Sequence, residues 1–443
     1  MNISIKPAII LGISLLSLQP SFAQNNNEDN TLTLSAQIRP KSEFRNGAFT
    51  PLSSNQDPAA LISQRTRLSA NYQYKDDLSI QITPQFVNVW GQDPLSQGAA
   101  NKNGFGLYEA WAKIKLGTGT YLQAGRQVIS LDDERFYGES DWGQGGRSHD
   151  AISLHYDGEQ GAFKAFGAFN QNYKELYNNN MYNPAGSLFS SKDAANYKWM
   201  QTLWGRYNFD KNMYISGIFS NLGFQNALDA MDSAKTYFNQ TLGANFSSTV
   251  KNTKFDLSAY YQFGDNAQGK NTQAYLLAAK IENKINKNWS LAIGGDFLSG
   301  NDVGVTPSSD NEAFIPYFGT NHKFYGAMDY FYAGNGHKGT GLIDAYLKAS
   351  YKHNNNWAWN FTLHNFATNN KIYTGIDYLG ANLGQELDID FAFAINKFTK
   401  LTGGYSVFLN TESLDYLKGV NNTNSTQHWA WLSLNVNPKI FSK

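Results

Sequence analysis

The sequence predicts an all-β protein: a single transmembrane antiparallel β-barrel of about 18 strands, with short periplasmic turns and long extracellular loops. Three observations support this class. Apolar and polar residues alternate along many short runs. Short and long polar connections alternate between those runs. Charged residues make up only 16% of the chain and aromatic residues 15%. Alternation allows one strand face to meet lipid while the other faces an aqueous lumen.

The first 23 residues differ from the rest of the 443-residue chain. Lys6 gives a basic start, Ala8–Leu18 is an apolar run, and Ser21–Ala23 has the small-x-small pattern of a cleavage site. Such a layout predicts a secretory signal peptide over residues 1–23. The apolar run is too short to span a bilayer as a helix. Residues 24–443 are therefore expected to form the barrel.

The alternation is clearest in three runs, Lys254–Phe263, Leu342–Tyr351 and Glu386–Ile395, each with one apolar and one polar face. Such runs predict strands with one face in contact with lipid. A secreted β-sandwich also has short alternating strands and is the alternative fold. A sandwich does not require its connections to alternate in length along the whole chain, which favours the barrel.

The connections predict the number of strands. Short links lie near residues 75–77, 117–119, 157–161, 210–212, 250–253, 283–287, 353–356 and 396–399. Long polar segments lie near residues 45–60, 91–103, 130–148, 171–196, 224–234, 264–271, 300–339, 367–379 and 411–426. Eight short links alternating with nine long ones require eighteen strands. We assign residues 323–333 to the longest loop, because an odd strand count would prevent antiparallel closure.

The first hairpin carries basic residues on its polar faces. With a hairpin centre near residue 53, Arg39 is expected opposite Arg67, and Lys41 opposite Arg65. Like charges directly opposite each other are destabilising. Something negative must therefore offset them: a lumenal carboxylate such as Glu109, or an anionic solute.

Arginine is confined to the first half of the chain. None of the eight arginines follows Arg206. The candidate residues for pore lining and solute binding are Arg39, Lys41, Arg65, Arg67, Lys113 and Arg206. The candidate lumenal acids are Glu109, Glu386, Asp388 and Asp390. Two interpretations stay open: a basic track for an anion, flanked by acids that keep binding weak, or a ladder of internal salt bridges that stiffens the wall.

Other motifs predict no catalytic, cofactor or metal site. Gly334–Gly339 matches G-x-G-x-x-G but lies between strands, where a dinucleotide site is not expected. Asp132–Glu134 could hold a hard cation such as Ca²⁺, although such a cluster is more often simply a solvated loop. Zero cysteines exclude disulfides and thiolate metal sites. The sequence offers no convincing pair of a nucleophile and a base, so we expect that the protein is not an enzyme.

The stretch Tyr121–Tyr156 contains two strand-like runs around a polar loop. Its residues Ala124–Gln127, Asp133–Arg135, Trp142 and Arg147–Asp150 resemble the core pattern of the alginate export family of outer-membrane β-barrels. Further resemblance lies in residues 316–331 and 383–388. The resemblance implies an eighteen-stranded monomeric barrel whose arginine-lined pore exports the polyuronate alginate. It also implies that Arg126, Arg135, Arg147 and Asp150 are shared family residues, which we expect to brace the loop, with Arg135, Arg147 and Asp150 doing so by ion pairing.

Two functions follow as hypotheses. The first is an outer-membrane channel that passes anionic sugars or polysaccharide. The second is a general diffusion porin for small solutes, in which acids neutralise the lumenal arginines. Either function places the protein in the cell outer membrane, in contact with lipid, with no cofactor and no nucleic acid partner. The sequence names no periplasmic export partner.

Overall fold

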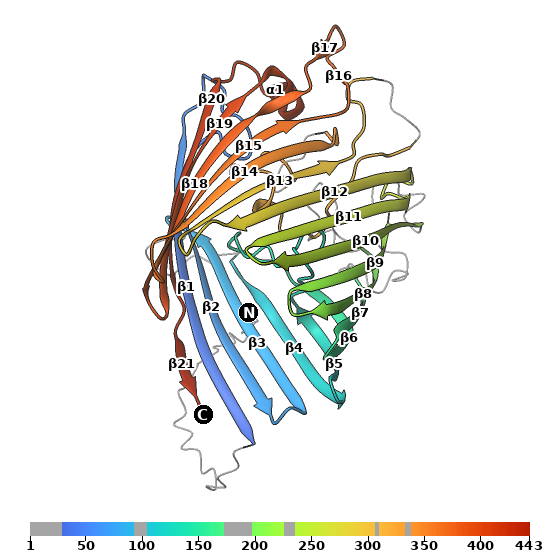
Figure 1. Ribbon diagram of the computed structural model, residues 1–443, viewed down its shortest axis with the longest axis vertical. Helices are drawn as coiled ribbons and strands as arrows, with labels where there is room; N and C mark the ends of the chain where they lie inside the picture. Colours follow the sequence, from blue (N-terminus) through green and yellow to red (C-terminus); the bar gives the residue numbers. More distant parts are fainter. Residues whose placement is uncertain (1–28, 93–103, 172–196, 226–234, 306–309, 333–337) are drawn as a thin grey trace, which may run out of the picture.

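The strands of the computed structural model form a barrel wall in which they follow one another in chain order (Figure 1). The structure describes residues 29–92, 104–171, 197–225, 235–305, 310–332 and 338–443. The signal peptide predicted over residues 1–23 lies outside the described residues and stays a prediction. So do most of the long connections predicted at residues 91–103, 171–196 and 224–234.

The strands are long and pair antiparallel with their neighbours along the chain. They are β1 (Asn30–Asn46), β2 (Ala59–Tyr74), β3 (Leu78–Val89), β4 (Phe105–Gly117), β5 (Thr120–Gln127), β6 (His149–Gly158), β7 (Gly161–Phe169), β8 (Trp199–Asp210), β9 (Met213–Gln225), β10 (Thr236–Val250), β11 (Thr253–Asp265), β12 (Asn271–Lys284), β13 (Trp289–Leu298), β14 (Leu342–Lys352), β15 (Trp357–Ala367), β18 (Asn382–Asn396), β19 (Thr399–Asn410), β20 (Thr426–Val436) and β21 (Lys439–Ser442).

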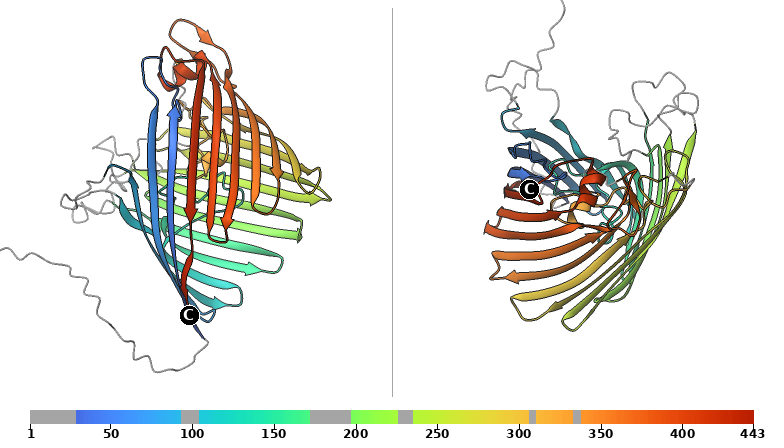
Figure 2. Two further views of the ribbon diagram at one scale, coloured as in Figure 1. Left: turned by 90° about the vertical axis from the view of Figure 1, so that its left-hand side faces the viewer. Right: turned by 90° about the horizontal axis from the view of Figure 1, so that it is seen from above.

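The barrel closes through β1, which pairs with both β20 and β21. The strands β20 and β21 occupy one strand position of the wall and are separated by a break around Pro438. Counted as one strand, they give the wall eighteen strands, as predicted. Figure 2 shows the final strands beside β1 at this seam. A proline has no backbone N–H to donate, which explains why the pairing breaks there.

Alternation along each strand separates lipid-facing from lumen-facing side chains. Leu257, Leu277 and Ile293 on neighbouring strands are large, apolar and about half exposed, as expected for an outer face that meets lipid. Ser258 and Asp296 on the same strands are buried and point into the barrel. The predicted alternation of apolar and polar residues therefore gives the barrel wall a lipid-facing side and a lumen-facing side.

The register of the first hairpin differs from the prediction. Arg39 lies opposite Arg65, while Gln37 lies opposite Arg67 and Lys41 opposite Ser63. The hairpin centre is at residue 52, since (39 + 65)/2 = 52, and not at residue 53. The pairing is therefore shifted by two positions, and an even shift keeps every side chain on its predicted face.

The connections at residues 128–148 and 310–332 fold into the barrel and contact each other. Tyr137 and Phe318 form a parallel backbone bridge, and the Gly138 N–H donates to the Phe318 carbonyl at 2.8 Å. The Tyr137 hydroxyl reaches the inner face of the wall at Thr202 and Ser220, at 2.8 and 2.9 Å. We call these two segments together the inner plug.

The remaining elements are short. They are the 3-10 turn η2 (Asn321–Lys323), the strands β16 (Ile372–Tyr373) and β17 (Tyr378–Leu379), and the helix α1 (Glu412–Lys418). Thr411 caps the N-terminus of α1, and Gly419 ends the helix in the left-handed conformation. Within the described ranges, no helix is both long and apolar enough to cross a membrane. Residues 323–332 form no strand, which agrees with their assignment to the longest loop.

Candidate solute pathway in the lumen

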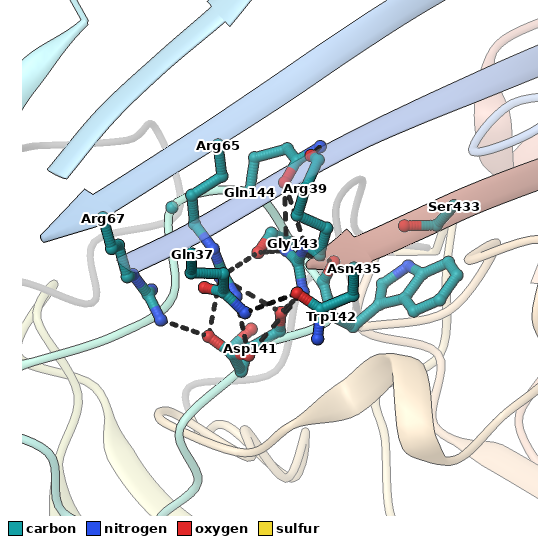
Figure 3. Close-up of polar contacts among 12 residues, drawn as sticks. Gln37, Arg39, Arg65, Arg67, Asp141, Trp142, Gly143, Gln144, Ser433 and Asn435 are labelled. Atoms are coloured by element: carbon teal, nitrogen blue, oxygen red, sulfur yellow. Dashed lines mark hydrogen bonds and ion pairs between the residues drawn. The ribbon is translucent and has the colours of Figure 1, made fainter. Parts of the chain in front are cut away.

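The inner plug carries one carboxylate into a group of three arginines on the wall. Arg65 holds Asp141 with two hydrogen bonds, Nη1 to Oδ1 at 2.7 Å and Nη2 to Oδ2 at 3.0 Å. Arg67 donates to Oδ1 at 3.0 Å, and Arg39 forms a weaker ion pair at 3.6 Å (Figure 3). We call Arg39, Arg65 and Arg67 the arginine clamp. A planar guanidinium suits this two-point grip on a carboxylate.

The clamp also holds the backbone of the plug. Arg39 donates to the carbonyls of Asp141 and Gly143 at 2.8 and 2.9 Å, and to the Gln144 side chain. Gln144 returns a hydrogen bond to Ser63 at 3.0 Å. Burial raises the pKa of Asp141, but the hydrogen bond and charge of Arg65, followed by the other two arginines, bring that pKa below its usual range. Asp141 is therefore a carboxylate near neutral pH.

Three guanidinium groups face this single carboxylate, so the clamp has an excess of positive charge. Two buried donors, Arg65 Nε and Arg67 Nη2, have no hydrogen-bond partner among the described residues. The Arg67 guanidinium also stacks over the Tyr108 ring at 3.4 Å. Stacking leaves a guanidinium edge free to donate, which suits a site that binds an anion.

The structure places most basic residues of the first hairpin against the plug. The Arg65 side chain has 0% exposed surface. Lys41 is buried, pairs with Glu43 at 3.5 Å, and lies 4.5 Å from the centre of the Trp142 ring. The expected solute contact of Arg65 and Lys41 is therefore not available in this arrangement, because plug groups occupy the space in front of them.

A second group of cations faces the lumen from β4, β7 and β8, near the short turns. Lys113 lies 4.1 Å from the centre of the Tyr121 ring. Lys164 and Arg206 flank Trp204, at 5.4 and 5.8 Å from a ring centre. Within the described part of the chain, no carboxylate forms an ion pair with any of these three cations. We call Lys113, Lys164 and Arg206 the basic arc.

Sequence reasoning selected Lys113 and Arg206 but missed Lys164. Lys164 lies directly opposite Trp204, and its neighbour Ala162 lies opposite Arg206. Lys164 directly follows the outward-facing Phe163, so alternation along the strand places Lys164 on the lumenal face. The sequence pattern could therefore have identified it.

The acidic residues line the opposite wall, and two of them anchor the plug. Glu386 Oε1 accepts from the Met328 N–H at 2.7 Å, and Asp388 Oδ2 accepts from the Ala327 N–H at 3.4 Å. Asp390 accepts from the Asn360 side chain at 2.8 Å. Glu109, expected to offset the arginines, instead accepts from its strand neighbour Trp111 at 3.0 Å.

A cavity of about 730 Å³ lies between the plug and the wall from β11 to β18. Both charge signs line it. Asp256 pairs with Lys254 at 2.8 Å and with Lys280 at 3.3 Å, and Lys280 also pairs with Glu282 at 3.5 Å. This is a charge-compensated ladder, unlike the basic arc. The lumen therefore has a cationic side and a mixed side.

Comparison with known proteins identifies the family to which this barrel belongs. The family model described as alginate export matches residues 30–428. The chain belongs to the alginate export family. No curated protein matches its sequence. Members of this family are outer-membrane β-barrels, and this chain is a porin-like barrel of the cell outer membrane.

Solved structures share the fold of this alginate export family member at low sequence identity. OccAB4 of Acinetobacter baumannii has a TM-score of 0.60 and 10% identity, with 94% of this chain and 99% of that chain covered. OccAB2 of the same organism has 0.59 and 13%, covering 93% and 98%. The outer membrane protein OpdK of Pseudomonas aeruginosa has 0.58 and 10%, covering 94% and 99%.

Two of the arginines that the sequence predicts to be shared with the family connect the plug. Arg135 pairs with Asp133 at 2.5 Å and with Asp296 of β13 at 2.7 Å. Arg147 donates to the carbonyls of Phe318 and, at 2.9 Å, Gly319, and so joins the two plug segments. Burial lowers the pKa of Arg147 to about 10. No ion pair of Arg147 occurs within the described ranges, so its contact to the plug is through backbone carbonyls and not through the expected carboxylate.

The other two family residues lie elsewhere. Arg126 and Asp150 are cross-strand neighbours on β5 and β6 and form an ion pair at 2.9 Å. Their side chains are 38% and 61% exposed, on the face opposite the buried Gln127 and His149. This pair therefore joins two strands on the outer face of the barrel, near the start of the plug. The alternation of inward and outward side chains along the two strands could have predicted this outer placement from the sequence.

The acidic run Asp132–Glu134 of this family member does not converge on one point. Asp132 accepts from Ser216, Trp204 and Asn245 on the wall. Asp133 faces Arg135, and Glu134 accepts from Ser130 at 2.8 Å. Within the described ranges, no three His, Cys, Asp or Glu side chains lie close enough together to hold a metal ion. The Asp132 side chain is half-buried, and its three hydrogen bonds anchor the plug to the wall.

Proposed function

We propose that the protein is a passive outer-membrane channel for anionic sugars of the uronate class, including polyuronates such as alginate. The basic arc carries this proposal. Its three cations face the lumen from β4 and from the adjacent strands β7 and β8, and no carboxylate forms an ion pair with them within the described residues. An anion that passes the arc gains charge attraction without having to break a salt bridge. Weak, multi-site attraction of this kind permits both entry and release.

Aromatic rings beside these cations suit sugars in particular. Tyr121, Trp204 and Tyr214 lie next to Lys113, Lys164 and Arg206. An aromatic face packs against the apolar face of a sugar ring, while a neighbouring cation attracts its carboxylate. The family description, alginate export, agrees with this substrate class.

Ion selectivity in planar bilayers tests the proposal. The native channel should prefer anions, and galacturonate should block its current more strongly than galactose does. Replacing Arg206 with Ala should lower the anion-to-cation permeability ratio by about threefold. One unit charge at about 6 Å in water contributes about 0.7 kcal/mol, which salt screening roughly halves, and this energy acts once as attraction of the anion and once as repulsion of the cation. Reversal potentials measured in a KCl gradient give this ratio directly.

The compensated ladder supplies the matched control. The double substitution Lys254→Met with Asp256→Asn removes one cation and one anion from the lumen. This double variant should keep the anion preference of the native channel. A channel without anion preference, or equal effects of the Arg206 and ladder variants, would contradict the proposal and favour a general diffusion porin whose lumenal charges cancel.

A further inference from the structure

The arginine clamp has the composition of a carboxylate-binding site, but its occupant is part of the same chain. The Asp141 carboxylate receives two hydrogen bonds from Arg65 and one from Arg67. The Asp141 side chain is still 31% exposed, whereas those of Arg65 and Arg67 are 0% and 9% exposed, so a solute in the lumen reaches these guanidinium groups only where Asp141 gives way. Arg65 Nε and Arg67 Nη2 are buried and have no hydrogen-bond partner within the described ranges, so one aspartate does not saturate the site.

The segment that carries Asp141 is a small closed loop. The Arg147 N–H donates to the Glu139 carbonyl at 2.7 Å and closes its neck. Three glycines, Gly143, Gly145 and Gly146, lie between Asp141 and that neck, and Gly146 has a φ of +66°. A loop of this kind can move as a unit about its neck. We call residues 139–147 the plug tip.

The ion pairs of Asp141 join two charged side chains between the plug tip and the first hairpin. Other contacts there are hydrogen bonds to uncharged groups, such as Arg39 to the Gly143 carbonyl at 2.9 Å and Gln144 to Ser63 at 3.0 Å, and the contact of Lys41 with the Trp142 ring at 4.5 Å. A hydrogen bond between two charged groups is roughly twice as strong as one between neutral groups. Removing the Asp141 contact therefore removes the strongest polar attachment of the plug tip to the first hairpin.

We propose that Asp141 is a built-in competitor for the solute: a free carboxylate takes its place in the arginine clamp and releases the plug tip. The proposal rests on the proposed function, because it assumes that carboxylated sugars enter the lumen. Competition follows from the shared chemistry, since both anions bind the same guanidinium edges. The channel is then more open when its own solute class is present.

A single introduced cysteine can report the release. The chain contains no cysteine, so Gly143→Cys provides one thiol in the plug tip. A Cβ at this position meets its nearest atom, the Ser140 carbonyl oxygen, at 3.6 Å, which is an ordinary contact. The rate of labelling by uncharged N-ethylmaleimide is measured on the full chain in lipid vesicles. Galacturonate is the probe, and galactose is the neutral control.

Galacturonate should increase the labelling rate of Gly143→Cys at least about tenfold, whereas galactose should leave it unchanged. Adding Asp141→Asn should give the fast rate without any sugar, and galacturonate should then change nothing. Asp141→Glu, which keeps the charge, should label slowly. Asp150→Asn removes a carboxylate outside the clamp and is the matched control, with an expected response like that of the native background.

Two results overturn the proposal. If galacturonate leaves the labelling rate unchanged while the channel prefers anions, the proposed function stands and the exchange at the clamp is wrong. If Asp141→Asn labels as slowly as the native background, the carboxylate is not what holds the plug tip. If the native channel shows no anion preference but galacturonate still accelerates the labelling of Gly143→Cys, the proposed function alone is contradicted.

Discussion

Replacing Arg135 with Met should destabilise the barrel, because this residue connects the inner plug to the wall. The guanidinium pairs with Asp296 at 2.7 Å, and the two side chains are only 7% and 1% exposed. It also stacks over the Phe324 ring at 4.0 Å. Burial lowers the pKa of Arg135, but Asp296 and Asp133 raise it above its ordinary value, so the group stays charged.

The expected loss follows from this burial. Removing one partner of a buried ion pair costs about 3–5 kcal/mol, because the other charge stays buried without compensation. The second pair of Arg135, with the partly exposed Asp133, adds at most about 1 kcal/mol. The cavity beside Asp296 lets water approach the orphaned carboxylate. We therefore expect the lower end of the range, about 3 kcal/mol.

A double-mutant cycle with Asp296→Asn measures the coupling. Equilibrium unfolding by urea in lipid vesicles, followed by tryptophan fluorescence, gives the free energy of unfolding of each variant. The double variant should be less destabilised than the sum of the two single variants by at least about 1.5 kcal/mol, the lower value for close charge pairs. Additive losses would refute the conclusion that this ion pair attaches the plug.

Three further predictions concern the plug. Tyr137→Phe should lower the free energy of unfolding by about 1 kcal/mol, the net value of a lost hydrogen bond; an unchanged urea midpoint would show that its wall contacts are unimportant. Gly138→Ala should separate the two plug segments and raise single-channel conductance, because its Cβ would lie 2.2 Å from Thr320 Oγ1. Gly143→Ala, whose Cβ would meet its nearest atom at an ordinary 3.6 Å, is the control, and equal conductances would count against this packing. The pKa of Asp141 is lowered on folding, so its contribution should be complete above the ordinary value of 3.8 and lost as pH falls through its folded pKa. Labelling of Gly143→Cys that accelerates already near pH 6 would assign the release to another group.

The sequence predicted the wall well because the wall depends on local pattern. The run Lys254–Phe263 lies within β11, and Glu386–Ile395 lies within β18. Period-two alternation and connection length are both visible in one sequence. The register of the first hairpin was less accessible, since it depends on where a long loop turns. The error of two positions kept Arg39 and Arg65 on the correct face.

The solute pathway could not be predicted in the same way. Asp141 meets Arg65 across a separation of 76 residues, and no periodicity connects a loop residue to a distant strand. Alternation identifies lumenal arginines, but it does not show which of them an inward-folded loop neutralises. Arg65 was therefore selected as a solute contact and proved to be a plug contact, whereas Arg206 stays exposed to the lumen.

The most direct test of the central claim is the reversal potential of the channel in a KCl gradient, for the native protein and for Arg206→Ala. The native channel should prefer anions, and the anion-to-cation permeability ratio of the variant should be about threefold lower. A native channel without charge preference, or a variant with an unchanged ratio, would contradict the claim that the basic arc attracts the solute.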